Sequence, residues 1–89
     1  MMTAEQAKVK TQARLKVIAE EFILNNVGVP LQEAIDAGRF HCTVFFEDSE
    51  KIGEEVVRQL KEQGYEAEHV YYDGPNGYDN HILIKWGDD

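Results

Sequence analysis

The first 25 residues of the chain contain no glycine and no proline, the two residues that most readily break a helix. Thr3 and Gln6 have the spacing of a capping box, in which both side chains satisfy free amides at a helix start. From Leu15 to Phe22, apolar residues recur at helical spacing on one face. A helix over residues 3–27 thus takes more than a quarter of the 89-residue chain, and the rest has room for about one sheet with further helices.

The first half of this helix has no obvious apolar face. Ala4, Ala7 and Val9 are small or isolated and stand among Lys and Gln side chains. A short helix that buries nothing is marginal in water. We therefore expect this half either to fray or to pack on a partner.

The sequence NNVGVP, residues 25–30, is expected to end the first helix. Gly28 permits a left-handed cap, and Val29 is pushed out of helical geometry because a proline follows it. Pro30 suits the first turn of a second, short helix, which Gly38 would end.

The remainder of the chain reads as strands around one helix. Residues 39–46, RFHCTVFF, are rich in β-branched and aromatic side chains and predict a strand. Residues 50–63 predict an amphipathic helix, with Gly64 placed for its C-cap. Residues 65–72 and 81–86 alternate as strands, and the Gly, Pro and Asn residues between them predict a hairpin connection over residues 73–80.

These elements predict an α+β fold, with N-terminal helices followed by β-α-β-β. Strand–helix–strand units are usually parallel and turn-linked strands antiparallel, so we expect a three-stranded mixed sheet. Residues 1–89 form one domain, in which residues 30–89 are the compact body and residues 3–27 are available for assembly. The helix of residues 50–63 is expected to cover one sheet face, made of Cys42, Val44, Phe46, Ala67, Ile82, Ile84 and Trp86. The N-terminal helices or another subunit must cover the second face.

The charge is unevenly distributed along the chain. Residues 1–30 hold four basic and three acidic side chains, for a charge of +1, whereas residues 31–89 hold five basic and fourteen acidic ones, for −9. An acidic body repels a phosphate backbone, which disfavours direct binding of nucleic acid. No apolar run is long enough to span a membrane, and no signal-peptide pattern opens the chain, so we expect neither membrane insertion nor secretion.

No pattern in the sequence predicts a catalytic, cofactor or metal site. The alternation places His69 on the sheet face opposite His41 and His81, which argues against a shared zinc ion. The acidic cluster of residues 47–55 lacks the spacing of a calcium loop and fits a helix cap and a solvated helix face. Cys42, the only cysteine, lies in an apolar strand and is expected to be a buried, inert thiol in a reducing compartment.

Exposed aromatic and apolar residues are the remaining candidates for function. Tyrosines beside a Gly-rich turn serve as core flanks, as protein interfaces or as the walls of a small-ligand pocket, and all three alternatives stay open. We expect the interface candidates to be Leu15, Phe22, Phe45, Val70, Tyr72, Tyr78 and Leu83.

Residues 15–86 resemble a recurring pattern in small tailed-bacteriophage proteins. The matching residues are Ala34, Ile35 and Gly38 in "Ala-Ile-x-x-Gly", Leu60, Gly64 and Tyr65 in "Leu-x-x-x-Gly-Tyr", and Ile84 and Trp86 in "Ile-x-Trp". The resemblance implies a phage setting, in the virion or the host cytoplasm. It carries no catalytic residue. The chain departs from the pattern in its second leading helix and in its longer loop over residues 73–80.

These observations lead to three functional expectations. The first is a non-enzymatic phage structural or assembly protein that binds copies of itself or a neighbouring protein, with a homo-oligomer expected. The second is an accessory inhibitor of a host protein, whose acidic surface imitates nucleic acid. The third is an oligomer that binds a small ligand between its subunits.

Overall fold

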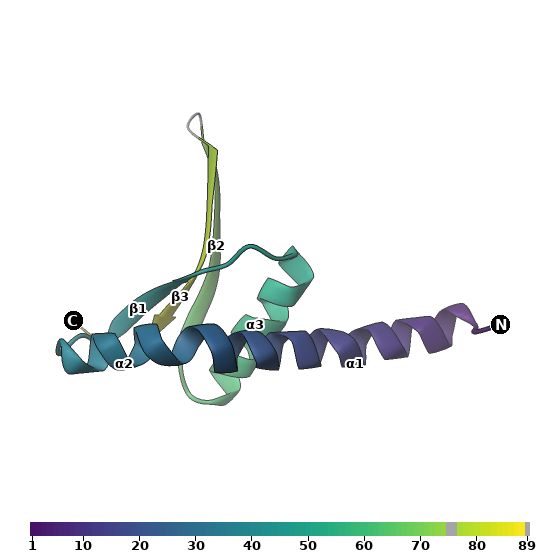
Figure 1. Ribbon diagram of the computed structural model, residues 1–89, viewed down its shortest axis with the longest axis horizontal. Helices are drawn as coiled ribbons and strands as arrows, with labels where there is room; N and C mark the ends of the chain where they lie inside the picture. Colours follow the sequence, from purple (N-terminus) through teal and green to yellow (C-terminus); the bar gives the residue numbers. More distant parts are fainter. Residues whose placement is uncertain (75–76, 89) are drawn as a thin grey trace.

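In a computed structural model, the chain has an α+β fold in which helices pack on one face of a three-stranded sheet (Figure 1). The structure describes residues 1–74 and 77–88, but not the side chains of residues 71–74 and 77–79. The α+β class predicted from the sequence is confirmed.

The N-terminal region is one continuous helix and not the two helices expected. α1 (Ala4–Phe22), the π-helical turn η1 (Ile23–Val27) and α2 (Gly28–Asp36) follow one another without a break (Figure 1). The expected left-handed cap at Gly28 is wrong, because its φ of −57° is that of a right-handed helix. The wider π turn lets the helix continue to Pro30, which has no N–H for the usual bond to the carbonyl four residues earlier.

The ends of this long helix match their sequence signals. At the start, the Gln6 amide donates to Thr3 Oγ1 at 3.2 Å and the Thr3 amide donates to Gln6 Oε1 at 3.0 Å, which confirms the capping box. At the far end, Gly38 has a φ of +74°, and the Arg39 amide donates back to the Ala34 carbonyl at 2.9 Å. Gly38 therefore ends the helix as predicted.

The sheet is wholly antiparallel, so the expected mixed sheet is wrong. Its strands are β1 (His41–Phe45), β2 (Glu66–Gly74) and β3 (Gly77–Lys85), arranged in the order β1-β3-β2. β1 and β2, which flank α3 (Glu50–Glu62) in the chain, do run in the same direction, but β3 lies between them and pairs antiparallel with both. The sequence pattern predicted the relative directions of the strands, but it did not predict that β3 lies between β1 and β2.

The β2–β3 hairpin is longer than the sequence predicts. β2 reaches Gly74, which pairs with Gly77 of β3, so most of the loop expected over residues 73–80 is strand. Pro75 and Asn76 lie outside the described residues. The hairpin rises away from the helices toward the top of the view (Figure 1).

The core lies between the inner face of the sheet and the helices. α3 contributes Ile52, Val56 and Leu60, and its bounds agree with the predicted helix to within one residue. Ser49 caps α3 by accepting a bond from the Ile52 amide at 3.4 Å, and Gly64 follows the helix with a φ of +92°. The buried side chains of the sheet are Cys42, Val44, Phe46, Ile82 and Ile84, with Ala67 and Trp86 partly buried against them.

Candidate functional site

The face of the sheet turned away from the core is the first candidate surface. Side chains alternate along a strand, so Thr43 and Phe45 of β1 point away from the buried Cys42 and Val44. In the register of the sheet, Phe45 and Val70 both flank His81. Together these positions form what we call the outer sheet face: His41, Thr43, Phe45, Glu66, Glu68, Val70, His81, Leu83 and Lys85.

Three apolar residues around His81 form what we call the apolar centre of the outer sheet face, and charged residues lie toward one end of it. Phe45, Val70 and Leu83 come from three different strands, and Phe45 is 64% exposed. Glu66 and Glu68 lie along β2, and Lys85 lies at the end of β3 that pairs with Glu66. An apolar centre with charged residues at its rim is the usual make-up of a protein-binding surface.

The seven interface candidates are not brought together at one site. Phe45, Val70 and Leu83 share the outer sheet face. Tyr72 and Tyr78 are strand positions whose side chains lie outside the described part of the chain. Leu15 and Phe22 instead pack against the core, and the Phe22 ring meets Phe46 edge-on at 5.2 Å between ring centroids. The side of α1 that carries Leu15 and Phe22 is therefore occupied within the chain.

The outward side of the long helix holds apolar residues that the sequence analysis missed. Val17 is 40% exposed and Leu24 is 80% exposed. The sequence pattern did not indicate them, because the stronger apolar repeat of residues 15–23 lies on the inward side of the helix. Val17 and Leu24 are seven residues apart, a spacing that returns to the same side of a helix after two turns, and this is the signal that could have found them.

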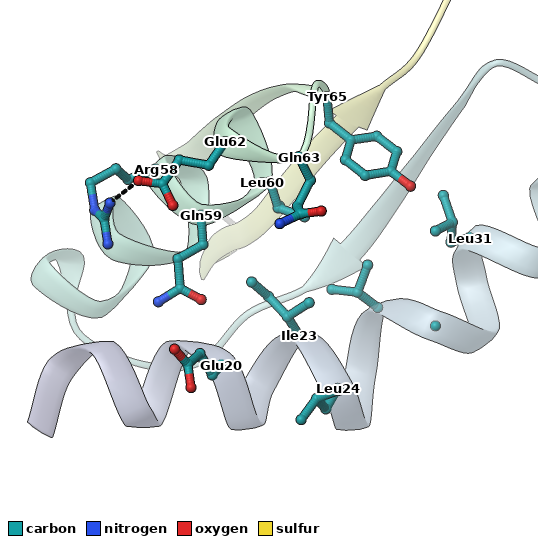
Figure 2. Close-up of a pocket in the computed structure, with 12 residues that line it drawn as sticks. Glu20, Ile23, Leu24, Leu31, Arg58, Gln59, Leu60, Glu62, Gln63 and Tyr65 are labelled. Carbon is teal, nitrogen blue, oxygen red and sulfur yellow. Dashed lines mark hydrogen bonds and ion pairs between the residues drawn. The ribbon is translucent and has the colours of Figure 1, made fainter.

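A groove runs between the long helix and the end of α3 (Figure 2). Its volume is about 710 Å³. The side chains of Ile23, Leu31, Leu60 and Tyr65 form its apolar part, and Leu24 lies at its edge (Figure 2). The polar residues along it are Glu20, Arg58, Gln59, Glu62 and Gln63.

Polar contacts hold α3 against α1 beside this groove. Gln59 Nε2 donates to the Lys16 carbonyl of α1 at 3.1 Å. Arg58 makes ion pairs with Glu55 and Glu62, one turn to either side of it in α3. The hydrogen bond from Arg58, supported by one from Gln59, lowers the pKa of the Glu55 carboxyl below its ordinary value, against the opposing effect of burial. The Gln59 hydrogen bond thus joins α3 to α1, whereas the ion pairs of Arg58 stay within α3.

The histidines and the cysteine are placed as the alternation predicts. His69 points to the inner face, where its ring meets Phe46 edge-on at 5.0 Å and its Nε2 contacts the Oδ1 of the buried Asn80. His41 and His81 belong to the outer sheet face. Burial raises the pKa of the Cys42 thiol, which disfavours the reactive thiolate. Within residues 1–74 and 77–88, no three His, Cys, Asp or Glu side chains are grouped to hold a metal ion.

In the described part of the chain, no helix has both the length and the apolar character needed to cross a membrane. The sequence matches no protein-family model, and comparisons with curated proteins and with solved structures gave no match.

Proposed function

We propose that the chain is a small non-enzymatic protein that acts through protein–protein contacts, as a structural or assembly component of a bacteriophage particle. The observation that carries this proposal is the outer sheet face, because its apolar centre is covered by no described helix and Phe45 stands 64% exposed there. The phage setting is supported by the resemblance of residues 15–86 to small phage proteins.

The occupant that fits this surface is a neighbouring protein of the assembly. Soluble proteins seldom leave a large apolar side chain exposed beside other apolar residues unless the patch meets a partner. β1 and β2 are also the edge strands of the sheet, so a partner can reach backbone donors and acceptors as well as the apolar centre. Contact with a neighbouring protein would therefore cover the exposed apolar residues and pair the free backbone groups of an edge strand.

Mass spectrometry of purified virions from the source tests the proposal directly. We expect peptides of this chain in the particles, at a level comparable with other minor structural proteins. Detection in infected cells but not in the particles would contradict a structural role.

A substitution then assigns the role to the outer sheet face. Phe45→Lys should reduce incorporation into particles, because it places a charge in the apolar centre of the contact. Ile35→Lys is the matched control, since Ile35 is also an exposed apolar residue but lies on α2. Equal incorporation of the two variants would remove the outer sheet face from the proposal.

An inhibitor of a host protein is a second candidate, favoured by the acidic start of α3. Glu47, Asp48, Glu50 and Glu54 are all exposed there, within residues 31–89, which carry a charge of −9. Such a surface attracts a basic protein that normally binds nucleic acid. Immobilised chain should then retain a basic host protein at low salt and release it at high salt, and retention that is insensitive to salt would contradict this candidate.

Ligand binding is a third candidate, favoured by the groove of Figure 2. Its volume of about 710 Å³ lies in the range of small-molecule sites. Protein purified from its native cells and then denatured should release a small molecule detectable by mass spectrometry. A sample that releases nothing would count against this candidate.

A further inference from the structure

The first turns of α1 contribute nothing to the core of the described chain, although Lys8, Thr11 and Gln12 line a hollow beside α3. All residues from Ala4 to Arg14, which we call the N-terminal arm, are exposed, and the first residue of α1 that packs against the core is Leu15. The arm extends beyond α3 toward the N-terminus (Figure 1). A helical segment of this length is marginal in water unless it packs on something, which makes the arm a candidate for contact with a partner.

The outward side of α1 continues the surface of the arm. Lys10, Val17 and Leu24 lie seven residues apart and so stand on one side of the helix, opposite the inward Leu15 and Phe22. Val17 and Leu24 are both exposed, and the exposed Ala13 lies beside them. We call Lys10, Ala13, Val17 and Leu24 the outward stripe. Its Lys contributes an aliphatic stem, and its Ala allows a second helix to approach closely.

The charges on either side of Val17 have opposite signs. Residues 4–16 hold Glu5 against four basic side chains, those of Lys8, Lys10, Arg14 and Lys16. Residues 17–27 hold Glu20 and Glu21 and no basic side chain. Two copies of α1 placed antiparallel bring the basic half of each beside the acidic half of the other. A parallel arrangement would set like charges together, so the sequence favours the antiparallel one.

We propose that two copies of the chain associate through the outward stripes of α1, packed antiparallel and crossing at Val17. This arrangement places Lys10 beside Leu24 of the second copy and Arg14 beside Glu21 of the second copy. Each N-terminal arm then lies along the acidic half of the other helix and next to the groove of Figure 2, which Leu24 borders. The inference deepens the proposed function, on which it rests, by naming a second copy as one of the partners.

Sedimentation of the purified full chain over a wide concentration range tests the association. We expect a monomer–dimer equilibrium. Val17→Glu should raise the dissociation constant by at least about tenfold, because the two-fold axis brings two buried carboxylates together. Phe45→Glu is the control that removes the apolar centre of the outer sheet face, and it should leave the dissociation constant unchanged. Circular dichroism should show that both variants fold, since both side chains are exposed.

A charge swap tests the antiparallel orientation. Neither Arg14 nor Glu21 has an oppositely charged residue three or four positions away in its own helix, so single changes there act mainly on the contact between copies. Arg14→Glu and Glu21→Arg should each weaken the dimer several-fold, and the double variant should recover most of the loss. Failure of the double variant to recover would overturn the proposed register.

Cysteine cross-linking gives an independent readout of the same register. The native Cys42 is buried, so introduced thiols can be read separately. A mixture of Lys10→Cys and Leu24→Cys chains should form a disulfide-linked dimer, because the antiparallel register brings these two positions to a distance that a disulfide spans. Lys10→Cys alone should not cross-link efficiently. Efficient self-cross-linking of Lys10→Cys would indicate parallel helices and overturn the proposal.

Other outcomes separate this inference from the proposed function. A wild-type chain that stays monomeric at every concentration overturns the helix-mediated dimer, yet the chain can still be incorporated into particles through Phe45. A dimer that Phe45→Glu dissociates and Val17→Glu does not would assign self-association to the outer sheet face and also overturn the inference. Absence from virions together with an intact dimer would instead contradict the proposed function alone.

Discussion

At the scale of single residues, the close approach of α3 to the sheet depends on one glycine. A Cβ atom at Gly53 would lie 2.5 Å from Nδ1 of His69, which is too near for any real contact. The His69 ring cannot turn aside freely, because it contacts both Phe46 and the buried Asn80. Gly53 therefore persists inside α3 although glycine is the weakest helix former after proline.

Replacing Gly53 by alanine should destabilise the protein. Alanine favours the helix by about 1 kcal/mol, but the forced displacement of His69 costs about 1–3 kcal/mol, so we expect a net loss. Gly28→Ala is the matched control, because Gly28 is also helical and nothing lies within 4 Å of its Cβ position. That variant should gain about 0.4–1 kcal/mol. Urea unfolding at monomeric concentrations measures both, and a Gly53→Ala chain as stable as Gly28→Ala would contradict the packing described.

The helix caps that were predicted correctly differ from the one that was not in how local their cause is. Gly38, Gly64 and the Thr3–Gln6 capping box act locally, through backbone geometry and bonds within one turn, and each was predicted correctly. Gly28 is also a glycine, but unlike Gly38 and Gly64 it has the backbone angles of a right-handed helix. Its conformation depends on the packing of residues on both sides of it, which no local pattern reports.

At the scale of elements, the π turn η1 sets the rotation of α2 relative to α1. One residue more than an α-helical turn needs rotates all later side chains by about 100°. With the observed rotation of α2 relative to α1, Val27 and Ala34 are both buried. They lie near the side of the helix that carries Phe22. The irregular turn therefore lets one helix present a continuous apolar side to the core across Pro30.

Deletion of Asn25 should convert the π turn into an ordinary α-helical turn. Val27 and Ala34 would then rotate away from the core, and we expect a loss of roughly 2–4 kcal/mol from their lost burial. Deletion of Lys10, in the exposed N-terminal arm, is the matched control, because it rotates only residues that bury nothing. Urea unfolding of the two variants at monomeric concentrations measures the difference. Equal stability would show that the phase of α2 does not depend on the π turn.

The sheet shows where element prediction fails. Alternation placed His69 on the inner face and Phe45 on the outer one, because alternation is a property of each strand by itself. The position of β3 between β1 and β2 is a choice among pairings of similar local geometry. In this position β3 forms antiparallel hydrogen bonds with both β1 and β2, and no pattern within a single strand predicts that arrangement.

At the scale of the whole molecule, the protein is elongated, with extents of 53 × 35 × 20 Å. The long helix and the β2–β3 hairpin both extend past the region where α3 meets the sheet (Figure 1). The sequence predicted no apolar face for the first half of the N-terminal helix, and the exposed N-terminal arm agrees with that prediction. The site could be predicted only in part, because Leu15 and Phe22 pack inside the same chain while Val17 and Leu24 remain outside.

The two-layer build of the molecule predicts opposite behaviour for two neighbouring phenylalanines. Phe46 is 1% exposed and packs between Phe22 and His69, whereas Phe45 is 64% exposed on the outer sheet face. Phe46→Ala should cost about 3–5 kcal/mol, a large share of the roughly 5–15 kcal/mol that stabilises a domain. Phe45→Ala should change the stability of the monomer by less than about 1 kcal/mol.

Urea unfolding of both alanine variants below the concentration of self-association tests this contrast. If Phe45→Ala were as costly as Phe46→Ala, the outer sheet face would be part of the monomer's own core, and the surface on which the proposed function rests would not exist. If the contrast holds, Phe45 is retained for a reason other than folding. A free energy of unfolding that is nearly unchanged, together with reduced incorporation of Phe45→Lys into particles, would then separate the contribution of this residue to assembly from any contribution to the fold.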